Sequence, residues 1–222
     1  MKTVVFDLDG TLADTSGDLI AAANTCFRDL GMGDLLDPAK DQGTALRGGR
    51  AMLTLGFERA EGVADPTKID AQYPLLLKAY AKDIDRHTVM YPGAVAAVER
   101  LLAAGYKTAI CTNKPEGLAQ ELMTRLGVRD LFGALIGADT LPTRKPSPDP
   151  YFAAVKAAGG EGHASLLVGD TKTDRDTARA ANVPSLLVTF GPQGLDAVCD
   201  LAPEAFLDHF DDLDAAVQQL IG

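Results

Sequence analysis

Two aspartates follow directly after a short apolar run near the start of the chain. The run Thr3–Phe6 leads into Asp7 and Asp9, which stand one residue apart before a Gly-Thr turn signal. The run favours a strand that is buried on both faces. A carboxylate buried at the end of such a strand is costly unless it is paired or binds a metal. The spacing alone also arises by chance, because the chain has 31 acidic residues among 222.

Further polar residues follow later apolar runs, and together with Asp7 and Asp9 they are candidates for a reactive site. Thr112 and Asn113 belong to the sequence Thr-Asn-Lys-Pro, and Lys145 lies in a proline-rich loop, Arg-Lys-Pro-Ser-Pro-Asp-Pro. Asp170 and Asp174 form a second acid pair within Gly-Asp-Thr-Lys-Thr-Asp. Two acid pairs, a hydroxyl and an ammonium are the groups needed to transfer a phosphoryl group to a carboxylate.

Phosphoryl transfer to a carboxylate needs such a set because the nucleophile and the phosphate are both negative. Each unit pair of charges repels by on the order of 5 kcal/mol at ~3 Å and an effective dielectric of ~20. A hard divalent cation held by carboxylates, together with an ammonium, neutralises that charge. A hydroxyl and the backbone amides at a helix start bind the remaining phosphate oxygens.

Alternating strand and helix patterns from Tyr91 onward predict the scaffold that positions these groups. The alternation is typical of an α/β fold with a parallel sheet and helices on both faces. Ligands bind such sheets beyond the carboxyl ends of the strands. We expect strands over residues 3–6, 107–112, 134–137, 165–169 and 184–189, and helices over residues 94–104, 116–126, 148–158, 173–181 and 211–221.

The segment between the first strand and this alternation lacks a strand pattern and predicts a helical insertion. Thr15 and Asp18 form a capping-box variant that starts a helix, and Gly31 ends it. Further helices are expected over residues 50–60 and 66–84, separated from the first by a flexible, basic break at residues 43–50. We therefore expect an α/β core domain from residues 1–14 and 90–222 and a helical domain from residues 15–89.

Composition excludes several other classes of protein. The sequence is 46% hydrophobic and 23% charged, as in globular proteins, and no apolar run approaches the roughly 18 to 20 residues of a membrane span. A net charge of −10 disfavours nucleic acid as a partner. Met1-Lys2 leads directly into the first strand, and three scattered cysteines predict neither disulfides nor a zinc site. We expect a cytoplasmic monomer or homodimer.

The ordered set of motifs resembles the haloacid dehalogenase (HAD) superfamily of phosphatases. Asp-x-Asp-Gly-Thr, a strand-end Thr, Lys-Pro and Gly-Asp-x-x-x-Asp occur in this order between residues 3 and 181. The resemblance implies a Rossmann-like parallel-sheet core. It also implies that the helical insertion after the first motif is the small helical cap of that superfamily.

Carried over position by position, the resemblance implies a role for each polar group. Asp7 is implied as the nucleophile that forms an aspartyl-phosphate intermediate. Asp9 is implied to protonate the leaving alcohol and then to activate water. Thr112 is implied to bind the phosphoryl oxygens, and Lys145 to balance the charge of Asp7 and the phosphate. A solvated loop cation is the alternative for Lys145, and Asn113 either orders the loop or contacts phosphate.

The same resemblance implies a magnesium site. Asp170 is implied to bind Mg²⁺ together with the Asp7 carboxylate and the Asp9 backbone carbonyl. Asp174 acts from close by, through the metal's shell or by orienting the loop; it is alternatively only the N-terminal acid of its helix. Mg²⁺ is favoured because every ligand is a hard oxygen and no His or Cys ligand is suggested nearby.

The second acid, Asp9, narrows the class of reaction. Dehalogenases and phosphonatases of the superfamily lack an acid at this position, so its presence favours a phosphatase or a phosphomutase. Thr-Asn-Lys-Pro and Lys-Pro-x-Pro-x-Pro are most similar to phosphoglycolate phosphatases, which implies a small phosphate monoester, 2-phosphoglycolate above all, as substrate. A β-phosphoglucomutase-like enzyme, a pyrophosphatase or nucleotidase on the same scaffold, and a non-enzymatic phosphate-binding regulator are the alternatives.

A basic segment of the helical insertion is a candidate for substrate binding. Arg47 and Arg50 flank two glycines, as in the specificity loop of phosphoglycolate phosphatase caps. We hypothesise that one of these arginines meets a carboxylate or second anionic group of the substrate. The alternative is a polar turn between helices.

Overall fold

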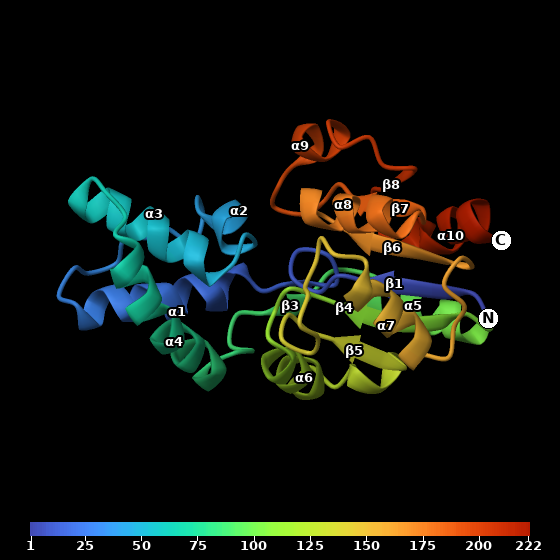
Figure 1. Cartoon of the computed structure of the whole chain (residues 1–222), viewed down its shortest axis with the longest axis horizontal. Helices are drawn as coiled ribbons and strands as arrows, with labels where there is room; N and C mark the ends of the chain where they lie inside the picture. The colour runs from blue at the N-terminus through green and yellow to red at the C-terminus, as the bar shows by residue number, and fades with distance from the viewer. The chain divides into compact units, whose positions relative to one another are not determined.

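The computed structural model describes residues 1–222 and divides into two compact units (Figure 1). One unit combines Met1–Ala13 with Met90–Gly222, and the other is Asp14–Val89. The first is an α/β unit and the second is helical. None of the helices is both long enough and apolar enough to cross a lipid bilayer.

The α/β unit contains a six-stranded sheet in the order β5-β4-β1-β6-β7-β8, with parallel pairing between all neighbours. Its central strand β1 (Thr3–Phe6) is fully buried, as its apolar sequence predicts. Phe6 pairs with Ile110 on one side and Val168 on the other, so these three strands end level with one another. The other strands are β4 (Lys107–Cys111), β5 (Ala134–Ile136), β6 (Ser165–Gly169), β7 (Ser185–Val188) and β8 (Ala205–Leu207).

Helices cover both faces of this sheet. α7 (Asp149–Ala157) and α8 (Lys172–Ala181) pack on the face that carries Val5, Ala109 and Leu167. α5 (Ala94–Ala103) packs on β4 and on α10 (Leu213–Ile221), which packs on β6. Right-handed crossovers place α5 opposite α7, because the chain crosses the sheet in the other direction after β5. The predicted fold class, a parallel sheet with helices on both faces, is confirmed. The remaining helical elements are α6 (Glu116–Arg125), α9 (Leu195–Cys199), η1 (Arg129–Leu131) and η2 (Phe210–Asp212).

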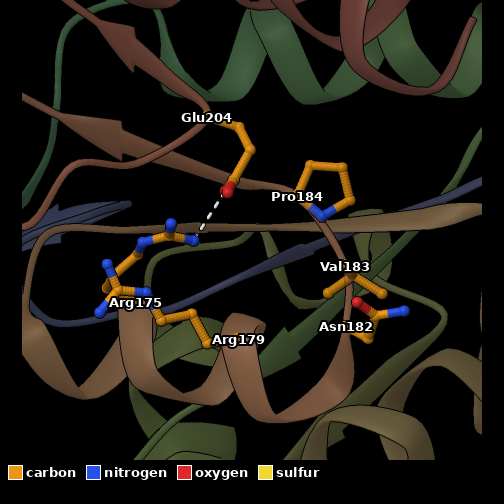
Figure 2. Close-up of a pocket in the computed structure, with 6 residues that line it drawn as sticks. All are labelled: Arg175, Arg179, Asn182, Val183, Pro184 and Glu204. Carbon is orange, nitrogen blue, oxygen red and sulfur yellow. Dashed lines mark hydrogen bonds and ion pairs between the residues drawn. The ribbon is translucent and has the colours of Figure 1, made fainter.

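The amino edge of the sheet carries a buried arginine that donates four hydrogen bonds. Arg175 Nη1 donates to Glu204 at 2.8 Å and to Ser185 Oγ at 3.1 Å. Its Nη2 donates to the Ala202 carbonyl at 2.8 Å, and its Nε to the Leu201 carbonyl at 3.3 Å. A hollow of about 330 Å³ opens beside this network (Figure 2). The hollow is lined by Arg175, Arg179, Asn182, Val183, Pro184 and Glu204.

The second unit is formed by α1 (Ser16–Asp29), α2 (Gln42–Ala45), α3 (Gly49–Glu61) and α4 (Pro66–Lys82). α1 packs against each of the other helices of this unit. Phe27 lies against Gly56, where an added Cβ would stand 2.0 Å from its Cζ atom, and forms an edge-to-face pair with Phe57. The helical insertion that the sequence predicts is present. The predicted flexible break is partly wrong, since α2 extends into it and α3 begins at Gly49.

The start of α1 differs from the predicted capping box. Thr15 occupies the N-cap position but makes no side-chain cap hydrogen bond. The buried Asp18 carboxylate instead accepts hydrogen bonds from the amides of His87 and Thr88, at 2.9 Å for each, and from the Thr88 hydroxyl at 2.8 Å. These donors outweigh a single N-cap amide, and they tie the beginning of the helical unit to its end. Close by, β2 (Ala13–Asp14) and β3 (Val89–Met90) form a two-stranded sheet.

Candidate active site

The polar groups expected at the strand ends lie along one edge of the sheet. β1, β4 and β6 are parallel and level, so Asp7, Thr112 and Asp170 all follow at the carboxyl edge. A tight turn follows Asp7, in which Gly10 adopts a φ of 82° and its amide donates to the Ala13 carbonyl. Only glycine adopts such a backbone conformation without strain, which explains the Gly of the Asp-x-Asp-Gly motif.

Asp7 is a buried carboxylate held by a backbone amide and an ammonium. Its Oδ1 accepts a hydrogen bond from the Leu8 amide at 2.7 Å and lies 3.0 Å from Lys145 Nζ. Burial raises the pKa of Asp7 to about 7; the Lys145 charge opposes this rise, and the charges of Asp174 and Asp9 add to it. The protein therefore holds Asp7 in a place where its negative charge is poorly stabilised without further positive charge.

Lys145 joins Asp7 to the second acid pair. Its Nζ lies 2.6 Å from Asp174 Oδ1, and the residue is only 3% exposed. Burial lowers the pKa of Lys145, but the adjacent charges of Asp174 and Asp7 outweigh burial and hold it above its usual value. Asn113 donates its side-chain amide to the Lys145 carbonyl at 3.0 Å and so orders the loop. Lys145 is therefore not a solvated loop cation.

Asp174 uses both of its carboxylate oxygens. Oδ1 binds Lys145, and Oδ2 accepts from the Thr171 amide at 3.0 Å and the Thr171 hydroxyl at 2.6 Å. Asp174 is thus the acid of the capping box that starts α8. A Cβ at Gly169 would stand 2.4 Å from Asp174 Cβ, so only glycine leaves room for this side chain. The helix-terminal role and the charge-pairing role of Asp174 coexist.

Asp170 has one carboxylate oxygen that the protein does not satisfy. Oδ1 accepts a hydrogen bond from Thr11 Oγ1 at 2.9 Å, whereas the buried Oδ2 has no hydrogen-bond partner. Burial raises the pKa of Asp170 well above its usual value, and the charges of Asp174 and Asp7 raise it further. An oxygen in this condition is a candidate ligand for a cation, because a buried acceptor without a partner is costly.

These acids form a cluster that fits a hard divalent cation. Asp7, Asp170 and Asp174 each place one carboxylate oxygen within 4.8 Å of the others, and all three residues are buried. Lys145 supplies one positive charge among three carboxylates. The donors are all oxygen, which suits Mg²⁺ better than a softer metal.

Asp9 and Lys114 form a second ion pair at the same edge. Lys114 Nζ lies 2.8 Å from Asp9 Oδ1, and the side chains are 3% and 17% exposed respectively. The Thr112 hydroxyl accepts a hydrogen bond from the Lys114 amide at 3.2 Å, which holds the loop after β4. Sequence reasoning assigned Lys114 no role, although it stands beside Asn113 in the Thr-Asn-Lys-Pro motif. Its proximity to Asp9 depends on tertiary structure.

The two arginines singled out in the sequence belong to the helical unit and have partners there. Arg47 Nη2 donates to Thr44 Oγ1 at 3.1 Å. Arg50 pairs with Asp70 at 2.6 Å, and its guanidinium lies 4.8 Å from the centre of the Tyr73 ring. Both pairs are exposed local contacts. Substrate binding by Arg47 or Arg50 therefore stays a prediction.

A parallel-sheet core whose carboxyl edge carries four polar motifs in this order is typical of one family of hydrolases. The sequence model of the haloacid dehalogenase-like hydrolase family matches residues 4–188, and the chain belongs to this family. This match spans every core residue that the sequence analysis assigned to the chemistry.

Within that family the chain is similar to phosphoglycolate phosphatases. It is 38% identical to the phosphoglycolate phosphatase of Mesorhizobium japonicum over 95% of this chain and 92% of that protein. It is 37% identical to the phosphoglycolate phosphatase of Rhodospirillum rubrum over 94% and 88% of the two chains. The crystal structure of a predicted phosphoglycolate phosphatase from Haemophilus somnus 129PT superposes with a TM-score of 0.86 at 24% identity, covering 98% of each chain. The predicted phosphoglycolate phosphatase-like enzyme class is confirmed.

Proposed function

We propose that this enzyme is a Mg²⁺-dependent phosphatase that hydrolyses a small phosphate monoester, 2-phosphoglycolate above all, through an aspartyl-phosphate on Asp7. The observation that carries the proposal is the buried group of Asp7, Asp170, Asp174 and Lys145 at the carboxyl edge of the sheet. The similar proteins named phosphoglycolate phosphatase support the choice of substrate. We place the reaction in the cytoplasm, with the enzyme as a monomer or homodimer.

In this proposal the metal is held by the Asp7 carboxylate, the partnerless Oδ2 of Asp170 and the Asp9 backbone carbonyl. A bound Mg²⁺ supplies positive charge that offsets the repulsion between Asp7 and the phosphate dianion. Asp174 is assigned the positioning of Lys145 rather than direct ligation, because both of its oxygens already accept hydrogen bonds.

The first half-reaction forms a bond between an Asp7 carboxylate oxygen and phosphorus and breaks the bond from phosphorus to the ester oxygen. Asp9 gives its proton to that oxygen, so the alcohol leaves neutral at the hydroxyl. Lys145 remains close to Asp7 and to the transferred group, where it balances their charge. The Thr112 hydroxyl and the backbone amides after β4 bind phosphoryl oxygens.

The second half-reaction returns the enzyme to its starting state. Asp9, now a carboxylate, takes a proton from a water that attacks phosphorus. The bond between Asp7 and phosphorus breaks, and inorganic phosphate leaves. The Lys114 ammonium lies 2.8 Å from Asp9 Oδ1. We further propose that the helical unit acts as the cap, with Arg47 or Arg50 facing an anionic group of the substrate.

Phosphate release from 2-phosphoglycolate and a panel of metabolite monoesters, with Mg²⁺ present, tests the proposal. Replacing the nucleophile, Asp7→Asn, is expected to lower turnover by at least about a thousand-fold. The exposed Asp130→Asn is the matched control and is expected to retain wild-type turnover. A wild-type protein that releases no phosphate from any monoester, or an Asp7→Asn protein that retains turnover, contradicts the proposal. Sugar-phosphate isomerisation without net phosphate release would instead indicate a phosphomutase.

A further inference from the structure

Lys114 is a buried ammonium to which the reaction proposed above assigns no contact with substrate. Its side chain is 3% exposed and its Nζ lies 2.8 Å from Asp9 Oδ1. Lysines are seldom buried to this degree, because removing an ammonium from water is costly even when it is paired. The burial of Lys114 therefore suggests a role in addition to holding the loop after β4.

The two buried lysines stand at different parts of the reacting group. Lys145 contacts Asp7 and Asp174, so it belongs to the carboxylates that meet phosphorus. Lys114 contacts Asp9, the residue assigned to the ester oxygen. Lys145 thus lies on the phosphoryl side and Lys114 on the side of the leaving alcohol.

The leaving alcohol of 2-phosphoglycolate carries its own negative charge. Its carboxylate is separated from the ester oxygen by a single methylene carbon, so it must lie near any group that can reach that oxygen. Asp9 is such a group, and Lys114 Nζ is in direct contact with Asp9. The overall charge of −10 repels an anionic alcohol unless a local cation offsets it.

We propose that Lys114 determines specificity by binding the carboxylate of the leaving group; this rests on the phosphatase function proposed above. An ammonium has three N–H donors, so Lys114 can donate to Asp9 and to a substrate carboxylate at the same time. The substrate class is then a phosphate monoester whose alcohol bears a carboxylate close to the ester oxygen. Lys145 and the acid cluster provide for the phosphoryl group in any monoester.

The test compares two substrates that differ only in this charge. 2-Phosphoglycolate carries the carboxylate, and 2-hydroxyethyl phosphate replaces it with a neutral hydroxymethyl group. We expect Lys114→Met to lower kcat/KM for 2-phosphoglycolate by about 10- to 100-fold more than for 2-hydroxyethyl phosphate, the scale of a lost charged hydrogen bond. Inhibition by inorganic phosphate is expected to stay unchanged, because phosphate occupies the Lys145 side.

Matched variants separate substrate binding from mere positioning of Asp9. Lys107→Met removes a lysine from the opposite end of β4 and is expected to leave the ratio of the two substrates unchanged. Lys114→Arg keeps the charge and is expected to retain part of the preference. Lys114→Gln carries the same comparison if the Met variant does not fold.

Three outcomes overturn the inference. Equal losses for both substrates show that Lys114 acts only through Asp9, and unchanged kinetics for both show that it does not act at all. A wild-type enzyme that hydrolyses 2-hydroxyethyl phosphate as well as 2-phosphoglycolate overturns the inference but leaves the phosphatase function standing. A wild-type enzyme that hydrolyses no monoester contradicts the proposed function itself.

Discussion

Asp170 and Arg175 are both buried charged residues, five positions apart in the chain, and they lie at opposite edges of the same sheet. At the amino edge, the Arg175 guanidinium donates to Glu204 (Figure 2). It also donates to Ser185 Oγ and to the Ala202 carbonyl. At the carboxyl edge, Asp170 Oδ2 has no partner and three carboxylates share a single lysine. The buried charge at the amino edge is paired and hydrogen-bonded, whereas the carboxyl edge has more buried negative charge than positive charge.

The difference separates charge that stabilises the fold from charge that serves the reaction in the proposed function. A protein loses stability when one partner of a buried, hydrogen-bonded ion pair is removed, because the other charge stays buried without its partner. Removing a buried carboxylate with a raised pKa has the opposite effect on stability, because its ionised form lowers the free energy of unfolding. Asp7 and Asp170 are of the second kind, since burial raises the pKa of each. Variants at the two edges should therefore change stability in opposite directions.

The largest expected contrast concerns Asp7 and pH in the absence of metal. The folded pKa of about 7 exceeds the usual value of 3.8, so the folded state binds more protons between these values. Wild-type stability should then fall as pH rises from about 4 to about 7, and Asp7 should contribute up to on the order of 4 kcal/mol to this fall. Asp7→Asn should show a smaller slope, because only the raised pKa of Asp170 remains. Urea denaturation in EDTA across this range measures it, and parallel profiles for the two proteins would contradict it.

At the opposite edge we expect a loss of stability without a loss of catalysis. Arg175→Met removes the cation paired with Glu204 and the donor to the Ala202 carbonyl, which should cost about 3 kcal/mol of unfolding free energy. Because Arg175 contacts no residue assigned to the reaction, kcat should stay within about two-fold of wild type at temperatures where the variant is folded. Denaturation and phosphate release on the same preparation test this. A stable Arg175→Met protein would refute the structural role.

Mg²⁺ should raise the unfolding free energy through the carboxyl edge of the sheet and not through the amino edge. At a Mg²⁺ concentration 100 times its dissociation constant, wild-type unfolding free energy should rise by about 2.7 kcal/mol. Asp170→Asn should lose most of this gain, because it alters the oxygen that has no partner in the protein. Arg175→Met should keep the gain in full. Thermal denaturation with and without Mg²⁺ measures all three, and equal stabilisation of Asp170→Asn would show that the metal binds elsewhere.

The smallest expected loss of stability is that of a Glu204 variant at the amino edge. Glu204→Gln keeps the size of the side chain but removes its charge, and this side chain is 40% exposed. Arg175 keeps its backbone acceptors, so the cost should be below about 1 kcal/mol. Urea denaturation of this variant beside Arg175→Met separates the charge of Glu204 from the other hydrogen bonds of the arginine. A cost as large as that of Arg175→Met would mean that the ion pair, rather than the other hydrogen bonds, stabilises this edge.

The parallel sheet could be predicted because its strands are apolar runs bounded by helices and turns. β6 was placed at residues 165–169, as the structure has it, and the strand ends indicated which residues gather. The sequence does not predict the edge strand β8, because this strand is short and only partly buried, with Phe206 43% exposed. Its sequence therefore lacks the apolar run that marks the other strands. α9 was missed for a similar reason, since it has only 5 residues.

Pairings between distant residues could not be predicted from local sequence. Thr15 and Asp18 have the spacing of a capping box, but the Asp18 carboxylate binds the amides of residues 87 and 88, about which its own neighbourhood says nothing. The contact between Lys114 and Asp9 likewise joins residues from two strand ends. Motif order indicated which strand ends bring polar groups together, whereas the partner of each side chain required the fold.

The carboxylate of Asp18 holds the first turn of α1 beside residues 87 and 88, near the end of the helical unit. A segment whose ends are adjacent adds no separation between the residues that flank it. The unit is therefore interchangeable in principle: another segment with ends equally close can be spliced between Ala13 and Met90 while the strand order of the core is kept.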